Sequence, residues 1–232
     1  MARRSFLHDY SQAAIVAVIV ALFVRTFLVQ AFQIPSPSMT DSILVGDHIL
    51  VNKFAYGPTL SLAERELLPF RDIARYDVVI FKFPNQPERD YVKRVIGLPG
   101  ETLKIENRET KIKKPGATDF SSLPEENSFV HFIDPPSAPD PEGLNNTQPV
   151  DIPENCYYVM GDNRDDSRDS RDWGWVPAEY IRGRALLVYW SVSPPEPSSA
   201  SSAPSGPLAS FWQSLSTGFT RTRWERTARM VH

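Results

Sequence analysis

Apolar residues form one long run near the N-terminus, from Ala13 to Ile34, which only four polar side chains interrupt. About 22 helical residues are enough to cross the ~30 Å hydrocarbon layer of a bilayer. Arg25 lies in the outer half of the run, where a long side chain can reach the interface. The pattern predicts a polar N-terminus over residues 1–12 and a transmembrane helix over residues 13–34. The exit from the run fits the A-x-A cleavage pattern of a secretory signal poorly.

Beyond this run, apolar and polar residues alternate as they do in β-strands, and helical periodicity is nearly absent. Strands are predicted over residues 48–54, 78–83, 90–96, 157–160 and 185–192. A short helix is predicted near residues 62–68. Residues 105–151 are charged, rich in proline and weakly patterned, which favours an excursion with short hairpins rather than core. The body is therefore predicted to be mainly β with few helices.

The composition changes twice toward the C-terminus. Residues 193–207 consist almost wholly of Pro, Ser, Ala, Gly and Glu, which predicts a linker with nothing to bury. In residues 208–232, apolar side chains recur at helical spacing and four arginines follow them. This tail is predicted to be a basic amphipathic helix at a membrane interface. A helix docked on the body and a frayed end are the alternatives.

The formal net charge of −3 hides an acidic body between two basic ends. Residues 34–207 carry 18 Lys and Arg against 26 Asp and Glu, whereas residues 1–33 and 208–232 have net charges of +2 and +3. The acidic body argues against nucleic acid as a partner, because phosphate binding needs a basic surface. The basic ends suit anionic lipid headgroups. The single cysteine, Cys156, can form no internal disulfide, which favours a packed core thiol.

The sequence I-P-S-P-S-M at residues 34–39 places two hydroxyl groups at the end of the apolar run. Pro35 and Pro37 fix their own φ and disfavour helix in the residues before them, so an arriving helix must end here. Ser38 therefore lies on stiffened, extended backbone. A serine becomes a nucleophile only when a neighbouring base accepts its proton. Without such a base, the stretch is merely a linker.

Histidine and metal chemistry are poorly supported. Three histidines lie in the ends or in the weakly patterned excursion: His8, His131 and His232. His48 and Asp47 are adjacent on a strand and point to opposite faces, so they cannot complete a triad with Ser38. Motifs of zinc proteases, zinc ribbons, α/β-hydrolases and penicillin-binding-type enzymes are absent. Residues 165–169 resemble the start of a calcium loop but lack its glycine and final glutamate, so neither a metal nor another cofactor is predicted.

Lys93 is the preferred base. In D-Y-V-K-R-V-I, residues 90–96, strand alternation puts Lys93 on the face of Tyr91 and Val95. An amine among apolar neighbours loses hydration, which disfavours its charged form and lowers its pKa. A neutral Lys93 can then accept the proton of Ser38. The alternative is a solvated lysine at a sheet edge.

Residues 161–177 hold five acids and three arginines in their first twelve positions. Opposite charges at this density can pair with one another and hold a loop rigid without a core of its own. Ser167 is a candidate to hydrogen-bond the amine of Lys93 and aim it. The alternative is an ordinary charged surface turn.

Three motifs in series carry a family resemblance: P-S-x-S-M after the apolar run, Y-V-K-R-V-I-G-L-P-G, and G-D-N-R-D-x-S-x-D-S-R-x-W-G-x-V-P. In this order, across residues 13–192, they resemble the type I signal peptidases, or leader peptidases. The resemblance implies a transmembrane helix followed by an antiparallel β catalytic domain over residues 35–192. It also implies a small inserted β subdomain, reduced here to residues 102–155, and a serine endopeptidase with a Ser/Lys dyad.

The resemblance implies roles for individual residues. Ser38 is the acylating nucleophile, Lys93 is the general base, and Ser167 orients Lys93. The hydroxyl of Ser36 joins the Ser38 backbone N–H in an oxyanion hole. A supporting salt bridge is implied for Asp169 and Arg171, and loop shape for Asp162, Asn163 and Arg164. The pocket walls for small substrate side chains match Ile34, Pro35, Met39, Ile43, Tyr91 and Val92.

The chain departs from the family pattern at two places. Asp41 and Ser42 stand where the family commonly has a proline-containing P-T-L, and Asp166 replaces a common asparagine. Neither place belongs to the implied dyad. The backbone after Met39 and the charge balance of the loop are therefore in question, but the reaction is not.

The sequence thus predicts a protease that removes N-terminal signal peptides from exported preproteins after a small-x-small site, through an acyl-enzyme. Arg3 and Arg4 orient the N-terminus to the cytoplasm. A single-pass protein of the cell inner membrane is expected, with its catalytic domain on the outer, periplasmic or lumenal, side. Preprotein signal peptides, membrane lipids and the secretion machinery are the expected partners. The alternatives are a self-cleaving Ser/Lys protease and a non-enzymatic, membrane-tethered β scaffold.

Overall fold

The computed structural model describes residues 6–23, 25, 29–53, 72–123, 128–135, 143–194 and 220–231. The helix expected near residues 62–68, the linker from residue 195 onward and the tail up to residue 219 lie outside the described residues. Strands predominate over helices in the described part of the body. The prediction of a mainly β body is therefore confirmed.

Among the described residues, only short helices follow the first helix. The described helices are α1 (Phe6–Phe23), α3 (Ser170–Trp173) and the 3-10 helices η4 (Arg164–Asp166), η5 (Ala178–Tyr180) and η6 (Trp224–Arg226). The described strands are β1 (Val29–Gln33), β2 (Asp47–Asn52), β3 (Val78–Phe83), β4 (Gln86–Gly97), β5 (Thr102–Glu106), β6 (Glu109–Lys113), β7 (Ser121–Ser122), β8 (Val150–Asp151), β9 (Cys156–Met160), β10 (Val176–Pro177), β11 (Ile181–Ser191) and β12 (Arg229–Met230).

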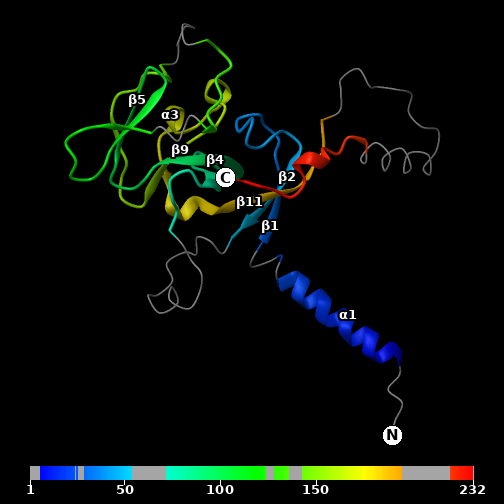
Figure 1. Ribbon diagram of the computed structural model, residues 1–232. Coiled ribbons are helices and arrows are strands. Elements are labelled where there is room, and N and C mark those ends of the chain that lie inside the picture. Colours follow the sequence, from blue (N-terminus) through cyan, green and yellow to red (C-terminus); the bar gives the residue numbers. More distant parts are fainter. Residues whose placement is uncertain are drawn as a thin grey trace.

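Most strands belong to one antiparallel sheet with the order β1-β2-β11-β3-β4-β9-β10, to which β12 is added beside β11. Figure 1 shows β2, β4 and β11 together at the centre of the body. The four consecutive apolar residues that begin β3 are all buried, as expected of a strand covered on both faces. This sheet contains all five strands predicted from the pattern, and β4 begins several residues earlier than predicted.

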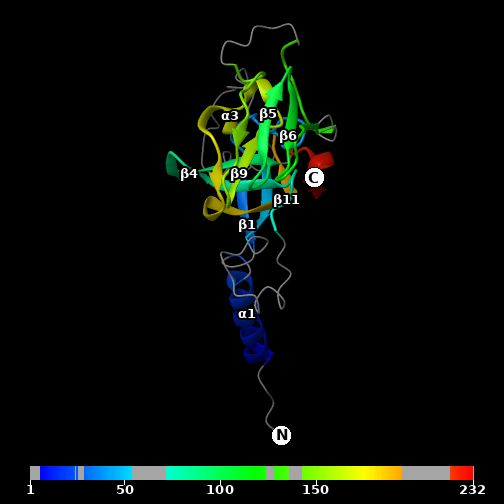
Figure 2. The same ribbon diagram turned by 90° about the vertical axis from the view of Figure 1, so that its left-hand side faces the viewer.

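The region expected to form an inserted subdomain contains a second sheet with the order β7-β6-β5-β8. β5 and β6 form a hairpin around Asn107 and Arg108, which both have positive φ, as a tight hairpin turn requires. Figure 2 shows these two strands side by side. Alternate side chains of the hairpin are buried in a hydrophobic cluster that includes Leu103, Ile105 and Ile112. The expectation of hairpins is confirmed, but the expectation that this region contributes no core is wrong.

The first helix is shorter at its C-terminal end than predicted. α1 ends at Phe23, and Val29–Gln33 is strand β1. The helix expected over residues 13–34 is wrong in this last part, because β1 pairs with β2 from Val29↔Asn52 to Gln33↔His48. Figures 1 and 2 show α1 projecting away from the sheets. Among the described residues, no helix combines the length and the apolar character needed to span a membrane.

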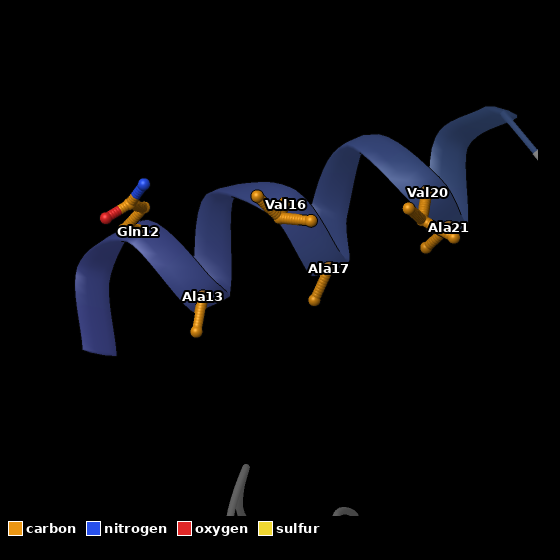
Figure 3. Close-up of a pocket in the computed structure, with 6 residues that line it drawn as sticks. All are labelled: Gln12, Ala13, Val16, Ala17, Val20 and Ala21. Atoms are coloured by element: carbon orange, nitrogen blue, oxygen red, sulfur yellow. The ribbon is translucent and has the colours of Figure 1, made fainter. Parts of the chain in front are cut away.

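α1 nevertheless exposes apolar side chains. Those more than half exposed are Ile15, Val16, Val18, Ile19, Val20, Leu22 and Phe23. Figure 3 shows a hollow along one face of the helix, lined by Gln12, Ala13, Val16, Ala17, Val20 and Ala21. A helix that is apolar over so much of its surface has no amphipathic division between a core face and a water face.

The C-terminal segment, residues 220–231, lies against the main sheet. β12 pairs with β11 through Leu187↔Met230 and Val188↔Arg229. The prediction of an interfacial amphipathic helix is wrong for these residues, because their backbone groups pair with the sheet. The alternative of docking on the body describes them better, although they dock as a 3-10 turn and a short strand.

Candidate active site

Residues 34–47 form the loop that carries Ser38, and we call it the Ser38 loop. Its two ends are tied together: Ile34 N–H donates to Asp47 O over 2.9 Å, and Gly46 N–H donates to Ile34 O over 3.0 Å. The end of β1 and the start of β2 are therefore adjacent, and the Ser38 loop closes between them. Ser38 is 8% exposed to solvent.

Lys93 lies within the main sheet, in β4 and opposite Val79 of β3. Only 2% of its surface is exposed, so the alternative of a solvated edge lysine is wrong. Its Nζ donates a hydrogen bond to Ser38 Oγ over 2.5 Å. The structure thus brings together the two side chains that the sequence singled out for the same reaction.

Burial lowers the pKa of Lys93 from 10.5 to about 8, although the nearby carboxylate of Asp169 opposes the shift. The cause is the loss of hydration, which penalises the charged amine. Near pH 8 a substantial fraction of the folded molecules therefore holds a neutral amine beside Ser38.

Asp169 is fully buried, and its carboxylate accepts several hydrogen bonds. Arg171 donates from Nε to Oδ1 and from Nη2 to Oδ2, each over 2.9 Å. Ser167 Oγ and Gly161 N–H donate to Oδ2 over 2.8 and 3.0 Å. Burial by itself would raise the pKa of Asp169, but the charge and hydrogen bonds of Arg171 hold that pKa below its ordinary value. The salt bridge implied for this pair is present.

Ser167 does not make the hydrogen bond to Lys93 that was expected of it. Its hydroxyl donates to Asp169 instead. Ser167 still lies near the Ser38 loop, because a Cβ atom on Gly161 would come within 2.2 Å of Ser167 Oγ and 2.5 Å of the backbone oxygen of Ser38. Ser167 therefore hydrogen-bonds to Asp169, whose charge raises the pKa of Lys93, and not to the Lys93 amine.

Asn163 and Asp162 tie this stretch to the neighbouring elements. Asn163 donates from its backbone N–H to Ser38 O over 3.1 Å and from Nδ2 to Pro37 O over 3.4 Å. Asp162 accepts from Arg94 Nε over 2.8 Å and from Arg94 Nη2 over 2.7 Å, and both side chains are buried. Sequence reasoning assigned Asp162 to loop shape but missed Arg94 as its partner. An arginine between two apolar residues of a strand was the available signal.

Ser36 lies beside Ser38, with 3.4 Å between the two hydroxyl oxygens. Its side chain is exposed, and it is therefore open to an approaching ligand. The geometry is compatible with a hydroxyl donor next to the attacking oxygen.

The residues expected to wall substrate pockets divide into two groups. Ile34, Met39 and Ile43 are 4%, 1% and 0% exposed and belong to the hydrophobic cluster beneath the loop. Their side chains lie below the surface in this structure. The exposed or partly exposed group consists of Pro35, Tyr91 and Val92.

His48 and His131 interact with residues other than Ser38 and Lys93. His48 stacks on Trp190, with 5.2 Å between ring centroids. His131 Nδ1 lies 2.9 Å from Asp41 Oδ2, a contact between the inserted subdomain and the Ser38 loop that the sequence did not indicate. Within the described residues, no three His, Cys, Asp or Glu side chains gather into a group that could hold a metal ion.

Comparisons with known proteins agree with the motifs. A profile of the family described as signal peptidase, peptidase S26, matches residues 7–190. A signal peptidase I of Pseudomonas aeruginosa is 35% identical over 224 residues, covering 84% of this chain and 76% of that protein. A signal peptidase I of Aquifex aeolicus is 30% identical over 240 residues, covering 77% and 82%. A crystal structure of a signal peptidase I from Enterococcus faecalis V583 matches with a TM-score of 0.36 and 27% identity, over 49% of this chain and 97% of that chain.

Proposed function

Because the chain belongs to the signal peptidase family, peptidase S26, we propose that it cleaves signal peptides from exported preproteins by a Ser38–Lys93 mechanism. Family membership supports a serine endopeptidase that acts on signal peptides. The single observation that carries the mechanism is the buried 2.5 Å contact between Lys93 Nζ and Ser38 Oγ.

In the proposed reaction, neutral Lys93 accepts the hydroxyl proton of Ser38 while Ser38 Oγ attacks the scissile carbonyl carbon. The oxyanion that forms is held by the Ser38 backbone N–H and the Ser36 hydroxyl. Protonated Lys93 then gives its proton to the leaving amine, and the peptide bond breaks to leave an acyl ester on Ser38. Lys93, neutral again, accepts a proton from water as that water attacks the ester, and gives this proton to Ser38 Oγ as the bond between Oγ and the acyl carbon breaks.

The lowered pKa of Lys93 suits both steps. A lysine with an ordinary pKa near 10.5 would be almost entirely protonated at neutral pH and could not act as a base. A pKa of about 8 leaves a usable neutral fraction while keeping the amine basic enough to take a proton.

The substrate is proposed to bind as an extended strand, so that alternate side chains enter shallow apolar pockets. Small residues at the first and third positions before the cleaved bond would fit against the partly exposed side chains of Tyr91 and Val92. Ile34, Met39 and Ile43 would form the apolar layer beneath, where their burial leaves little depth for a large side chain.

Membrane lipids are proposed as a partner, because α1 exposes a continuous apolar surface that water would penalise. On this proposal α1 is embedded in the inner membrane and the β body faces the outer side, where preproteins emerge. Flotation of the full chain with liposomes, compared with a chain whose α1 carries Val16→Glu and Val20→Glu, measures the contribution of the helix.

The test of the reaction uses the full chain in detergent and a synthetic precursor peptide with alanine at both small positions. Ser38→Ala and Lys93→Met are each expected to lower kcat on the order of 10³-fold or more. The matched control is Lys82→Met, because Lys82 lies on neighbouring β3 opposite Asp90 and is partly exposed. Wild-type rates in Lys93→Met would refute the mechanism.

A further inference from the structure

Asp47 is a buried carboxylate at the base of the Ser38 loop, and the sequence places no lysine or arginine next to it. Its side chain is 0% exposed. It accepts hydrogen bonds from Leu44 N–H over 2.9 Å and from Ser191 Oγ over 2.5 Å. Two arginines of the C-terminal segment complete the set: Arg226 Nη2 donates over 2.7 Å and Arg223 Nη2 over 3.1 Å.

These arginines also hold the backbone of the Ser38 loop directly. Arg226 Nη2 donates to Ser42 O over 3.1 Å, and Arg223 Nη2 donates to Val45 O over 2.8 Å. Each guanidinium therefore joins the Asp47 carboxylate to a backbone carbonyl in the part of the loop between Ser38 and β2. A planar guanidinium with several fixed donors is suited to this double attachment.

The segment contributes to the core under the loop as well. Val231 belongs to the same hydrophobic cluster as Ile34, Met39 and Ile43. Met39 is the residue that follows Ser38, so a side chain from the end of the sequence helps to support the position next to the attacking oxygen.

The charges of this cluster are mutually dependent. Burial by itself would raise the pKa of Asp47, but hydrogen bonds from Arg226 and Ser191 lower it below its ordinary value. Asp47 therefore stays ionised at neutral pH. Removing the carboxylate would leave two neighbouring cations without their buried partner, which is strongly destabilising.

The end of β11 and the start of the C-terminal segment are hydrogen-bonded to each other. Ser193 N–H donates to Arg221 O over 3.0 Å, and Arg223 N–H donates to Ser191 O over 2.9 Å. Ser193 and Arg221, which lie on either side of the undescribed stretch, are thus neighbours in space. A break among them would leave the C-terminal segment held by its own contacts.

We propose that the C-terminal segment, residues 220–231, is a positioning element for the Ser38 loop, acting through Arg223, Arg226 and Asp47. It holds Ser38 at hydrogen-bond distance from Lys93 without touching the substrate. This inference rests on the proposed function, since its main readout is the rate of precursor cleavage.

The first test compares two arginines of the same segment. Arg226→Met removes a buried donor, whereas Arg229→Met removes an exposed arginine whose backbone pairs with Val188. With Arg226→Met, kcat is expected to fall by about tenfold or more, with little change in KM, because misplacing the nucleophile slows the acylation step. Arg229→Met should match wild type. The rates are compared at a temperature where circular dichroism shows every variant folded, and an unchanged kcat in Arg226→Met would overturn the proposal.

The second test separates positioning from folding. A site-specific protease sequence is placed within residues 200–206 of the full chain, and the purified protein is cut there. The cut chain is expected to keep its C-terminal fragment on size exclusion and to keep its activity. The same cut in Asp47→Asn is expected to release the fragment and to lower kcat by about tenfold or more, with little change in KM.

The outcomes distinguish the two proposals. A cut chain that loses its fragment but cleaves the precursor at the full rate overturns the positioning role and leaves the proposed function intact. The positioning role is also overturned if the cut Asp47→Asn chain keeps its C-terminal fragment and cleaves the precursor at the wild-type rate. If the uncut wild-type chain cleaves no precursor at all, the proposed function itself fails.

Discussion

Lys93 donates a hydrogen bond to Ser38 across 55 positions of the sequence, and both side chains are buried. The two partners come from different kinds of structure, since Lys93 lies in the interior of a sheet and Ser38 on a loop. The sheet fixes the amine and removes its hydration, and the loop brings the hydroxyl to it. The protonation state of Lys93 and the position of the Ser38 loop are therefore the two quantities that perturbations of this site should change.

The pH dependence of cleavage should follow the pKa of Lys93. Since only the neutral amine accepts a proton, kcat/KM is expected to be low in acid and to rise to a plateau with a midpoint near pH 8. Precursor cleavage measured from pH 6 to pH 10 at constant ionic strength checks this. A midpoint near 10 would contradict the burial of the amine.

Asp166→Asn should move that midpoint to lower pH. The carboxylate of Asp166 is one of the charges that raise the pKa of Lys93, so its removal disfavours the protonated amine. Asp166 is exposed, and the displacement should therefore shrink at high salt. Asp172→Asn, on the same stretch, provides a matched loss of charge. A midpoint that moves upward in Asp166→Asn would contradict the sign.

Lys93→Met should stabilise the fold while abolishing cleavage. Below pH 8 the amine is protonated in both folded and unfolded chains, so the folded chain carries the full cost of a buried charge. Between pH 8 and 10.5 the folded chain releases its proton first, and wild-type stability rises with pH. The shift corresponds to ~3 kcal/mol at neutral pH.

Denaturant unfolding of both proteins at pH 7 and at pH 10.5 measures the difference. The advantage of Lys93→Met should be largest at the lower pH and should shrink at the higher one. Lys82→Met, at a partly exposed position, should show no such trend. Equal stability of wild type and Lys93→Met at both pH values would mean that Lys93 is hydrated in solution.

Gly161→Ala should lower activity more than stability alone explains. The added Cβ would lie 2.5 Å from the backbone oxygen of Ser38, so the Ser38 loop or the stretch around Ser167 must move. A displacement of about 1 Å at a reacting group costs on the order of 10²-fold in rate. Gly183→Ala is the matched control, because its Cβ would clash with Asn52 in the sheet instead. Per folded molecule, Gly183→Ala should retain its kcat and Gly161→Ala should not.

The sequence predicted the contact between Ser38 and Lys93 better than the contacts that support it. Ser38 and Lys93 were recognisable because prolines and strand alternation restrict their surroundings. The Ser167–Lys93 hydrogen bond was wrong because a buried, ionised Asp169 is a stronger acceptor than a neutral amine, and the pattern shows nothing of that competition.

The errors in the fold have a common cause. Val29–Gln33 has the pattern of the end of an apolar helix, but it pairs with β2 as a strand. The C-terminal arginines have the pattern of a lipid-binding face, but Arg226 pairs with the buried carboxylate of Asp47. Both depend on contacts between residues far apart in the chain. Local hydrophobic period and local charge carry no information on such contacts, so tertiary structure overrides them.

Asp41 occupies a backbone conformation that a proline cannot adopt. Its φ is +76°, in the left-handed region, whereas proline is confined near −65°. The loop after Met39 therefore does not accommodate a proline at position 41 without a change of its backbone. Asp41→Pro is expected to destabilise the protein by about 3 kcal/mol or more and to lower cleavage by displacing the Ser38 loop. Thermal unfolding and precursor cleavage measure the two effects.

Asp41→Gly separates backbone conformation from the side-chain contact. Glycine adopts positive φ without strain, so the backbone term should favour it slightly. The contact with His131 would be lost, but Asp41 and His131 are 64% and 37% exposed, and exposed pairs contribute about 0–1 kcal/mol. Asp41→Gly should therefore keep wild-type activity and nearly wild-type stability. If Asp41→Pro were as active as Asp41→Gly, the left-handed conformation at this position would not exist in solution.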